Sequence, residues 1–150
     1  MSYTALVETE TYHTADEIER LVRAFEDCTL PESGFNHCAH LTVALWYLYH
    51  HCGREAAVRI REGLKRFIAA KGGPSTPMGG YHETITMFWM FVIGKFLLLA
   101  DTGLSLVELA NGVVERYSDK GLLFEYYSLE RIFSMEARAG WVEPDLRPLG

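Results

Sequence analysis

Two strongly apolar stretches, residues 41–49 and 85–100, limit most what this chain can fold into. Each is apolar nearly all the way round at the helical period of about 3.6 residues, which is typical of helices that lie inside a protein. The second stretch is shorter than the roughly 20 residues that span a bilayer, and Lys95 interrupts it. The sequence therefore predicts two core helices and no membrane partner. Trp46 and Trp89, midway along these helices, are predicted to be largely buried.

Helix signals also appear on both sides of these stretches. Thr14 with Glu17 and Ser105 with Glu108 have the spacing of capping boxes, and Asn36 is a further N-cap candidate. Apolar periodicity and these caps predict helices at about residues 15–28, 37–52, 54–71, 81–100, 106–117 and 129–139. No strand pattern is convincing. We expect an all-α fold, an up-down helical bundle of about five or six helices.

The chain length of 150 residues fits one helical domain that covers residues 1–150. The clearest break, residues 72–80, is rich in glycine and proline. We interpret it as a loop, because neither half of the chain has enough helices for a core of its own.

Charge and cysteine content exclude some classes of protein. A net charge of -6 argues against a nucleic-acid partner, since such proteins usually carry a basic excess. The three cysteines, Cys28, Cys38 and Cys52, form no CxxC pair. Their odd number favours a reducing, cytoplasmic compartment over a disulfide framework.

Residue types that bind metals stand at the starts of both core helices. His37 and His40 lie three residues apart and so share one face of a helix. His82 and Glu83 open the second core helix. Alternating helices of an up-down bundle are parallel, so the starts of the two core helices lie at the same end. We expect these four residues to come together, provided that the two core helices are neighbours.

This grouping predicts a divalent metal site. His37, His40 and His82 would suit zinc with an open coordination position, whereas His37, His40 and Glu83 would suit iron(II). His82 and Glu83 are about 100° apart around the helix axis, so only one of them is expected to point at the site. Glu83 is the catalytic candidate, as general base or third ligand. The chain that returns to this end offers further candidates: Asp119, Glu125 and Tyr126.

The first functional hypothesis is a metal-dependent enzyme, hydrolytic or oxygen-activating, that acts on a small molecule with zinc or iron. The alternatives are a module that binds a small molecule or small anion at the helix N-termini, and a structural or interaction protein. In the last case His37 and His40 only support a helix start, and Glu83 only complements the helix dipole. The substrate and the formation of a homodimer stay open.

Three stretches carry a resemblance to a family: HCAHL (37–41), YHET (81–84) and SMEARAGW (134–141). They resemble those of an uncharacterised family of bacterial hypothetical proteins. The resemblance covers most of the chain and implies a stand-alone bacterial domain, without an activity. The architecture is more loosely similar to the DinB/YfiT-like helical bundles, which hold a metal with histidines from different helices. The spacing here departs from theirs, so no residue is carried over.

Overall fold

The computed structural model describes residues 11–73 and 79–150, and all regular structure in these ranges is helical. The long helices are α2 (Ala15–Glu26), α3 (His37–His50), α4 (Gly53–Ala70), α5 (Glu83–Leu99) and α6 (Leu106–Tyr117). The short ones are α7 (Leu123–Tyr126), α8 (Leu129–Ile132) and α9 (Met135–Ala139), with the 3-10 turns η1 (Glu32–Gly34) and η2 (Lys120–Leu122). The all-α prediction is confirmed. Of the predicted loop 72–80, residues 74–78 lie outside the described ranges.

Side-chain caps define the starts of three long helices. The Thr14 hydroxyl accepts a hydrogen bond from the Glu17 N–H, and the Glu17 carboxylate accepts one from the Thr14 N–H. Ser105 and Glu108 form the same reciprocal pair at α6. At α3 the Asn36 side chain accepts from the Ala39 N–H at 2.9 Å. Because each cap satisfies an N–H group that has no partner within its helix, these predicted starts are confirmed.

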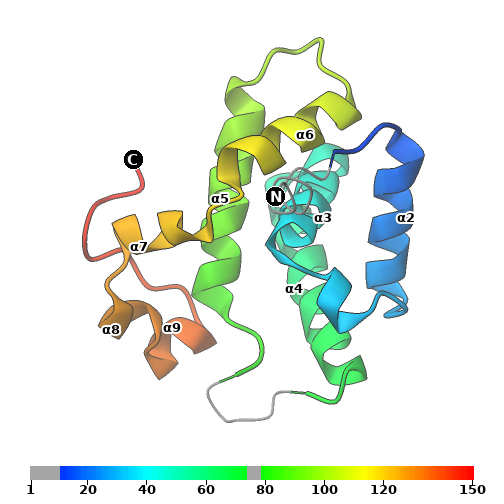
Figure 1. Cartoon of the computed structure of the whole chain (residues 1–150). Coiled ribbons are helices and arrows are strands. Elements are labelled where there is room, and N and C mark those ends of the chain that lie inside the picture. Colours follow the sequence, from blue (N-terminus) through cyan, green and yellow to red (C-terminus); the bar gives the residue numbers. More distant parts are fainter. Residues whose placement is uncertain (1–10, 74–78) are drawn as a thin grey trace, which may run out of the picture.

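Helix α3 is central and packs against α2, α4, α5 and α6 (Figure 1). Leu41 and Leu45 on one side of α3 and Val43 on the opposite side are at most 1% exposed. This burial on every side is what an all-round apolar helix requires. Helix α5 lies beside α3, so the condition for the two helix starts to meet is satisfied. In the described part of the chain, no helix combines the length and apolar character that crossing a bilayer demands.

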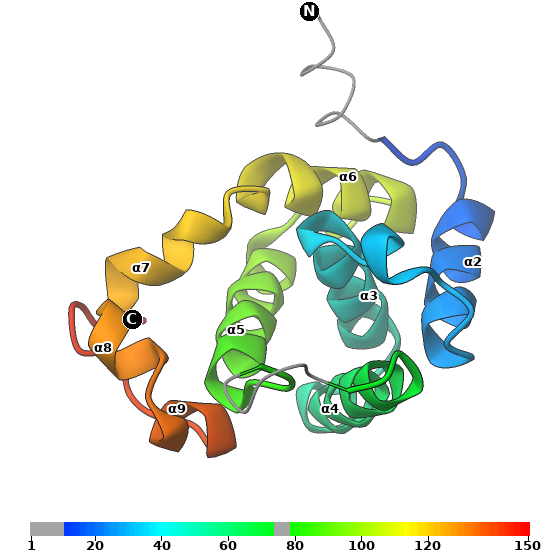
Figure 2. The ribbon, with the colours of Figure 1, turned by 60° about the horizontal axis from the view of Figure 1, so that its bottom comes forward.

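The segment after η2 forms a second layer, on the side of α5 that faces away from α3 (Figures 1 and 2). Phe88 of α5 packs there with Tyr127 and Ile132, and all three side chains are fully buried. The hydroxyl of Thr84 donates to the Gly140 carbonyl at 2.7 Å and accepts from the Val142 N–H at 3.1 Å. The first turn of α5 is therefore bonded directly to the C-terminal layer.

Two details differ from the sequence predictions. The helix expected at residues 129–139 is divided into α8 and α9, because the Ser134 side chain accepts from the Ala137 N–H and starts a new helix. Trp46 and Trp89 are half-buried rather than largely buried. Trp46 packs against the ring of His50 near the end of α3, with ring centroids 4.2 Å apart. Trp89 is accessible because it lines a cavity.

Candidate functional site

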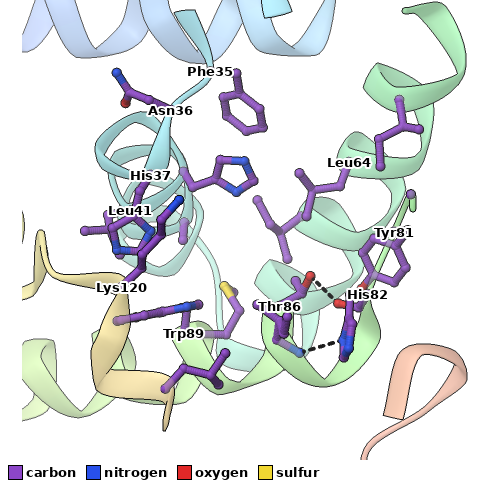
Figure 3. Close-up of a pocket in the computed structure, with 18 of the residues that line it drawn as sticks. Phe35, Asn36, His37, Leu41, Leu64, Tyr81, His82, Thr86, Trp89 and Lys120 are labelled. Carbon is purple, nitrogen blue, oxygen red and sulfur yellow. Dashed lines mark hydrogen bonds between the residues drawn. The ribbon is translucent and has the colours of Figure 1, made fainter. Parts of the chain in front are cut away.

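A cavity of about 580 Å³ lies between α3, α4, α5 and the η2–α7 segment (Figure 3). The first halves of α3 and α5 and the second half of α4 line it, as expected when α4 runs antiparallel to both neighbours. Apolar side chains form most of the wall, among them Leu41, Ala44, Ile60, Leu64, Ile85 and Met90. Small-molecule sites have a similar size, roughly 300–1,000 Å³, and a similar apolar lining.

His37 lies at the α3 end of the cavity. Its Nε2 donates a hydrogen bond to the Tyr117 carbonyl oxygen at 3.0 Å, and its ring meets Trp89 edge-on with centroids 4.8 Å apart. A carbonyl accepts only, so the proton sits on Nε2 and the lone pair of the neutral ring on Nδ1. Burial is the main cause of a lowered pKa for His37. The ring is therefore neutral at pH 7.

His40 lies one turn further along the same face, and its ring stacks on Phe35 with centroids 3.9 Å apart. The side chain lines the cavity and is exposed to it, while the ring packs on Phe35. Loss of hydration of the charged form, with smaller contributions from His37 and Lys120, lowers the pKa of His40 to about 4. Within the described ranges, neither ring nitrogen has a hydrogen-bond partner. His40 is thus held in place by stacking, with its polar atoms uncommitted.

His82 lines the same cavity but serves as the N-cap of α5. Its Nδ1 accepts from the Ile85 N–H at 3.1 Å, and its Nε2 donates to the Ile132 carbonyl at 2.6 Å. The side of the ring that caps α5 is visible in Figure 3. Burial, the main cause, lowers the pKa of His82 and so favours this neutral form. With both nitrogens occupied, the ring has no lone pair left for a metal ion.

Glu83 is engaged outside the cavity, between α4 and α5. Nε and Nη2 of Arg61 donate to its two carboxylate oxygens at 3.0 and 2.8 Å, and the Tyr81 hydroxyl donates to Oε1 at 2.6 Å. The bonds from Arg61 are the main cause of a lowered pKa for Glu83. The carboxylate is therefore ionised and held by an ion pair, where the sequence had indicated a ligand or general base.

The predicted meeting of the two helix starts is confirmed in part: His37, His40 and His82 line one cavity, whereas Glu83 lies outside it. However, in residues 11–73 and 79–150 no group of three or more His, Cys, Asp or Glu side chains is placed to hold a metal ion. The further candidates also have structural partners: Asp119 caps η2, Glu125 pairs with Arg147, and Tyr126 packs on Phe88.

Lys120 is the cavity residue that the sequence predictions missed. It reaches the α3 end of the cavity from η2, and its charge contributes to the lowered pKa values of both His37 and His40. Figure 3 shows it beside His37 in the view. The available signal was its position next to Asp119, in the turn where the chain returns to this end.

Comparison with protein-family models, with curated proteins and with solved structures finds no match. The resemblance to bacterial hypothetical proteins and to DinB/YfiT-like bundles stays a prediction. What the protein does has to be inferred from the geometry of the cavity.

Proposed function

We propose that the protein is a small-molecule binding module whose site is the cavity between α3, α4 and α5. The observation that carries this proposal is His40, a ring held by stacking on Phe35 that is exposed to the cavity and whose nitrogens have no partner among the described residues. A ligand in the cavity can therefore bond to His40 in place of water, without breaking a hydrogen bond of the fold. Helix capping does not explain His40 as it explains His82.

The apolar wall supports the same proposal. Ile60, Leu64 and Met90 are buried side chains that border the cavity without filling it. An apolar ligand of suitable shape would remove water from these surfaces, which stabilises the complex by about 25 cal/mol for each Å² of apolar area. A few polar groups in a mostly apolar cavity are the usual arrangement in small-molecule sites.

A ligand screen with a cavity-filling variant tests the binding function. Ala44 is 5% exposed and lines the cavity, so Ala44→Met places a longer side chain inside it. Ala69→Met, at an exposed position of α4, is the matched control. We expect compounds that raise the melting temperature of wild type to bind Ala44→Met at least about tenfold more weakly and the control equally well. Ligands that bind Ala44→Met as well as wild type would show that the cavity is not the site.

A metal-dependent enzyme is the second candidate, favoured by the pairing of His37 and His40. Nδ1 of His37 and one nitrogen of His40 offer two imidazole donors, and the lowered pKa values keep both rings neutral, as a metal requires. Water or a substrate would have to supply the remaining ligands of zinc or iron(II). Two protein ligands are fewer than the three or four of typical zinc sites, so this candidate ranks below the binding module.

Metal titration separates the two candidates. Zinc and, without oxygen, iron(II) are titrated by calorimetry into wild type, His40→Ala and His50→Ala, the last changing an exposed histidine at the opposite end of α3. If the enzyme hypothesis is right, binding is lost in His40→Ala and kept in His50→Ala. Equal, weak metal binding by all three proteins would contradict the metal-dependent enzyme and leave the binding module as the remaining hypothesis.

The proposed compartment is reducing, such as the cytoplasm. The odd number of cysteines, Cys28, Cys38 and Cys52, and the lack of a CxxC pair in the sequence support this proposal.

A further inference from the structure

The charges around the cavity differ from those of the chain as a whole. The chain has a net charge of -6. Among the described residues that line the cavity, however, there is no Asp, Glu or Arg, and Lys120 is the one with a full charge. Glu83 is paired with Arg61, and Asp119 accepts from the Gly121 N–H at 2.8 Å, although the Asp119 charge also acts on His37, against that of Lys120. The lining itself therefore carries one positive charge, in an acidic protein.

The polar groups of the cavity that are still able to bind a ligand gather at one end. Lys120, His37 and His40 lie at the start of α3, where the helix dipole adds a partial positive charge. Lys120 lines this end of the cavity and lies beside His37 in the view of Figure 3, and its charge contributes to the lowered pKa values of both imidazoles. Beyond them most of the wall is apolar, and the polar lining residues at the start of α5, Tyr81, His82 and Thr86, are already hydrogen-bonded within the protein. A ligand that fits this pattern has a negative group at one end and an apolar body.

We propose that the ligand of this cavity is an organic acid whose carboxylate lies between Lys120 and His40, with its apolar body against Ile60, Leu64 and Met90. The assignment rests on the proposed binding function and specifies its ligand class. The ammonium group supplies charge and donors, and His40 supplies one N–H, since a neutral imidazole carries a proton on either nitrogen. One cation matches one carboxylate, whereas phosphate sites usually combine several cationic or backbone donors.

Matched pairs of acids and neutral amides test the assignment. The probes are phenylacetate, 2-naphthylacetate and decanoate, each paired with its primary amide, which has nearly the same shape and no charge. Binding is measured by calorimetry at pH 7 to wild type, Lys120→Gln and Lys95→Gln. Lys120 and Lys95 are both exposed residues, and Lys95 lies outside this cavity, so both variants should fold and both lose one positive charge.

We expect at least one acid to bind wild type tenfold or more tightly than its amide. Lys120→Gln should reduce the affinity for that acid to the level of the amide and leave the amide unchanged, whereas Lys95→Gln should change neither. Equal affinity for acid and amide, with both weakened in Ala44→Met, would overturn the assignment to acids and leave the binding function intact. An acid preference that survives in Lys120→Gln would also overturn it. Binding of none of the six probes would overturn the assignment to organic acids, while the ligand screen with Ala44→Met still decides the binding function.

Discussion

The starts of α3 and α5 both carry histidines that line the same cavity, but the histidines differ in their hydrogen bonds. At α5, both nitrogens of His82 are hydrogen-bonded and Glu83 holds Arg61. At α3, Asn36 caps the helix, and His40 faces the cavity with no partner among the described residues. The start of α5 is thus committed to the fold, whereas the start of α3 is available to a ligand.

The identity of the cap explains this difference. A helix start leaves N–H groups that need an acceptor, and asparagine is among the best at supplying one. Since Asn36 fills that role at α3, the histidines that follow it do not have to accept a hydrogen bond from the helix N–H groups. At α5 the cap position is occupied by His82, so its own ring has to accept the hydrogen bond. A histidine one turn inside a capped helix is thus a better site candidate than a histidine at the cap.

The largest effect on the free energy of unfolding is expected at the start of α5. His82→Ala removes the acceptor for the Ile85 N–H and the donor to the Ile132 carbonyl, and that bond runs between buried groups. We expect the free energy of unfolding to fall by about 2–4 kcal/mol, from the lost cap and the unsatisfied carbonyl. Urea denaturation measures it. His82→Asn, which keeps a capping acceptor, should lose less, and a loss below about 1 kcal/mol in His82→Ala would show that this start is not structural.

A smaller loss is expected from the Arg61–Glu83 pair. Its side chains are 32% and 15% exposed, so solvent screens the ion pair only in part. We expect Glu83→Gln to lower the free energy of unfolding by about 1–2 kcal/mol. Combined with Arg61→Gln, the double variant should be little less stable than either single variant. Additive losses in this double-mutant cycle would contradict a direct coupling between the two residues.

A substitution of His40, at the start of α3, should have almost no effect on the free energy of unfolding. His40→Leu replaces an unpartnered polar ring by an apolar side chain, so we expect the free energy of unfolding to change by less than about 1 kcal/mol. The same variant should lose the tighter binding of the acid probes. Denaturation and calorimetry on the same samples separate the two readouts. A loss above about 2 kcal/mol would make His40 a structural residue and remove the contrast with His82.

The smallest effect concerns pH. The pKa of His40 is lowered to about 4, below its unfolded value, so between roughly pH 6.5 and 4 the unfolded chain binds more protons than the folded one. Stability is therefore lost as the pH falls through this window. The lowered pKa values of His37 and His82 act in the same direction. His40→Leu should show a shallower loss than wild type when urea midpoints are measured at pH 7, 6 and 5.

The size of this pH effect is limited because water in the cavity reaches the His40 ring and screens part of its charge. The charged and titratable groups that line the cavity with His40 are His37 on the same helix, Lys120 from η2, and Tyr81 and His82 from the start of α5, and His37 and Lys120 act on its pKa. The α4 wall of the cavity contributes apolar side chains. Equal pH dependence in His40→Leu and wild type would mean that His40 titrates normally.

Much of the fold follows from local patterns in the sequence. The caps Thr14, Asn36 and Ser105 act on N–H groups within three residues, and the all-round apolar character of α3 corresponds to its central position. The apolar end of α5 does not follow this rule, because Leu98 and Leu99 are exposed. Short connections then bring the two helix starts to one end, and the cavity is there. Each of these inferences requires only the identity of neighbouring residues or the direction of a helix, and both can be predicted from the sequence.

The roles of the site residues depend instead on atoms that are far apart in the chain. His82 is committed by a carbonyl at Ile132, Glu83 by a guanidinium at Arg61, and the charge in the cavity comes from Lys120. A hydrogen bond or ion pair requires a distance of about 3 Å and a suitable direction, and spacing along a helix specifies neither for a partner on another element. The sequence thus predicts that the histidines lie at the same end of the bundle. Only the packing determines that His82 is hydrogen-bonded within the fold, whereas His40 remains able to bind a ligand.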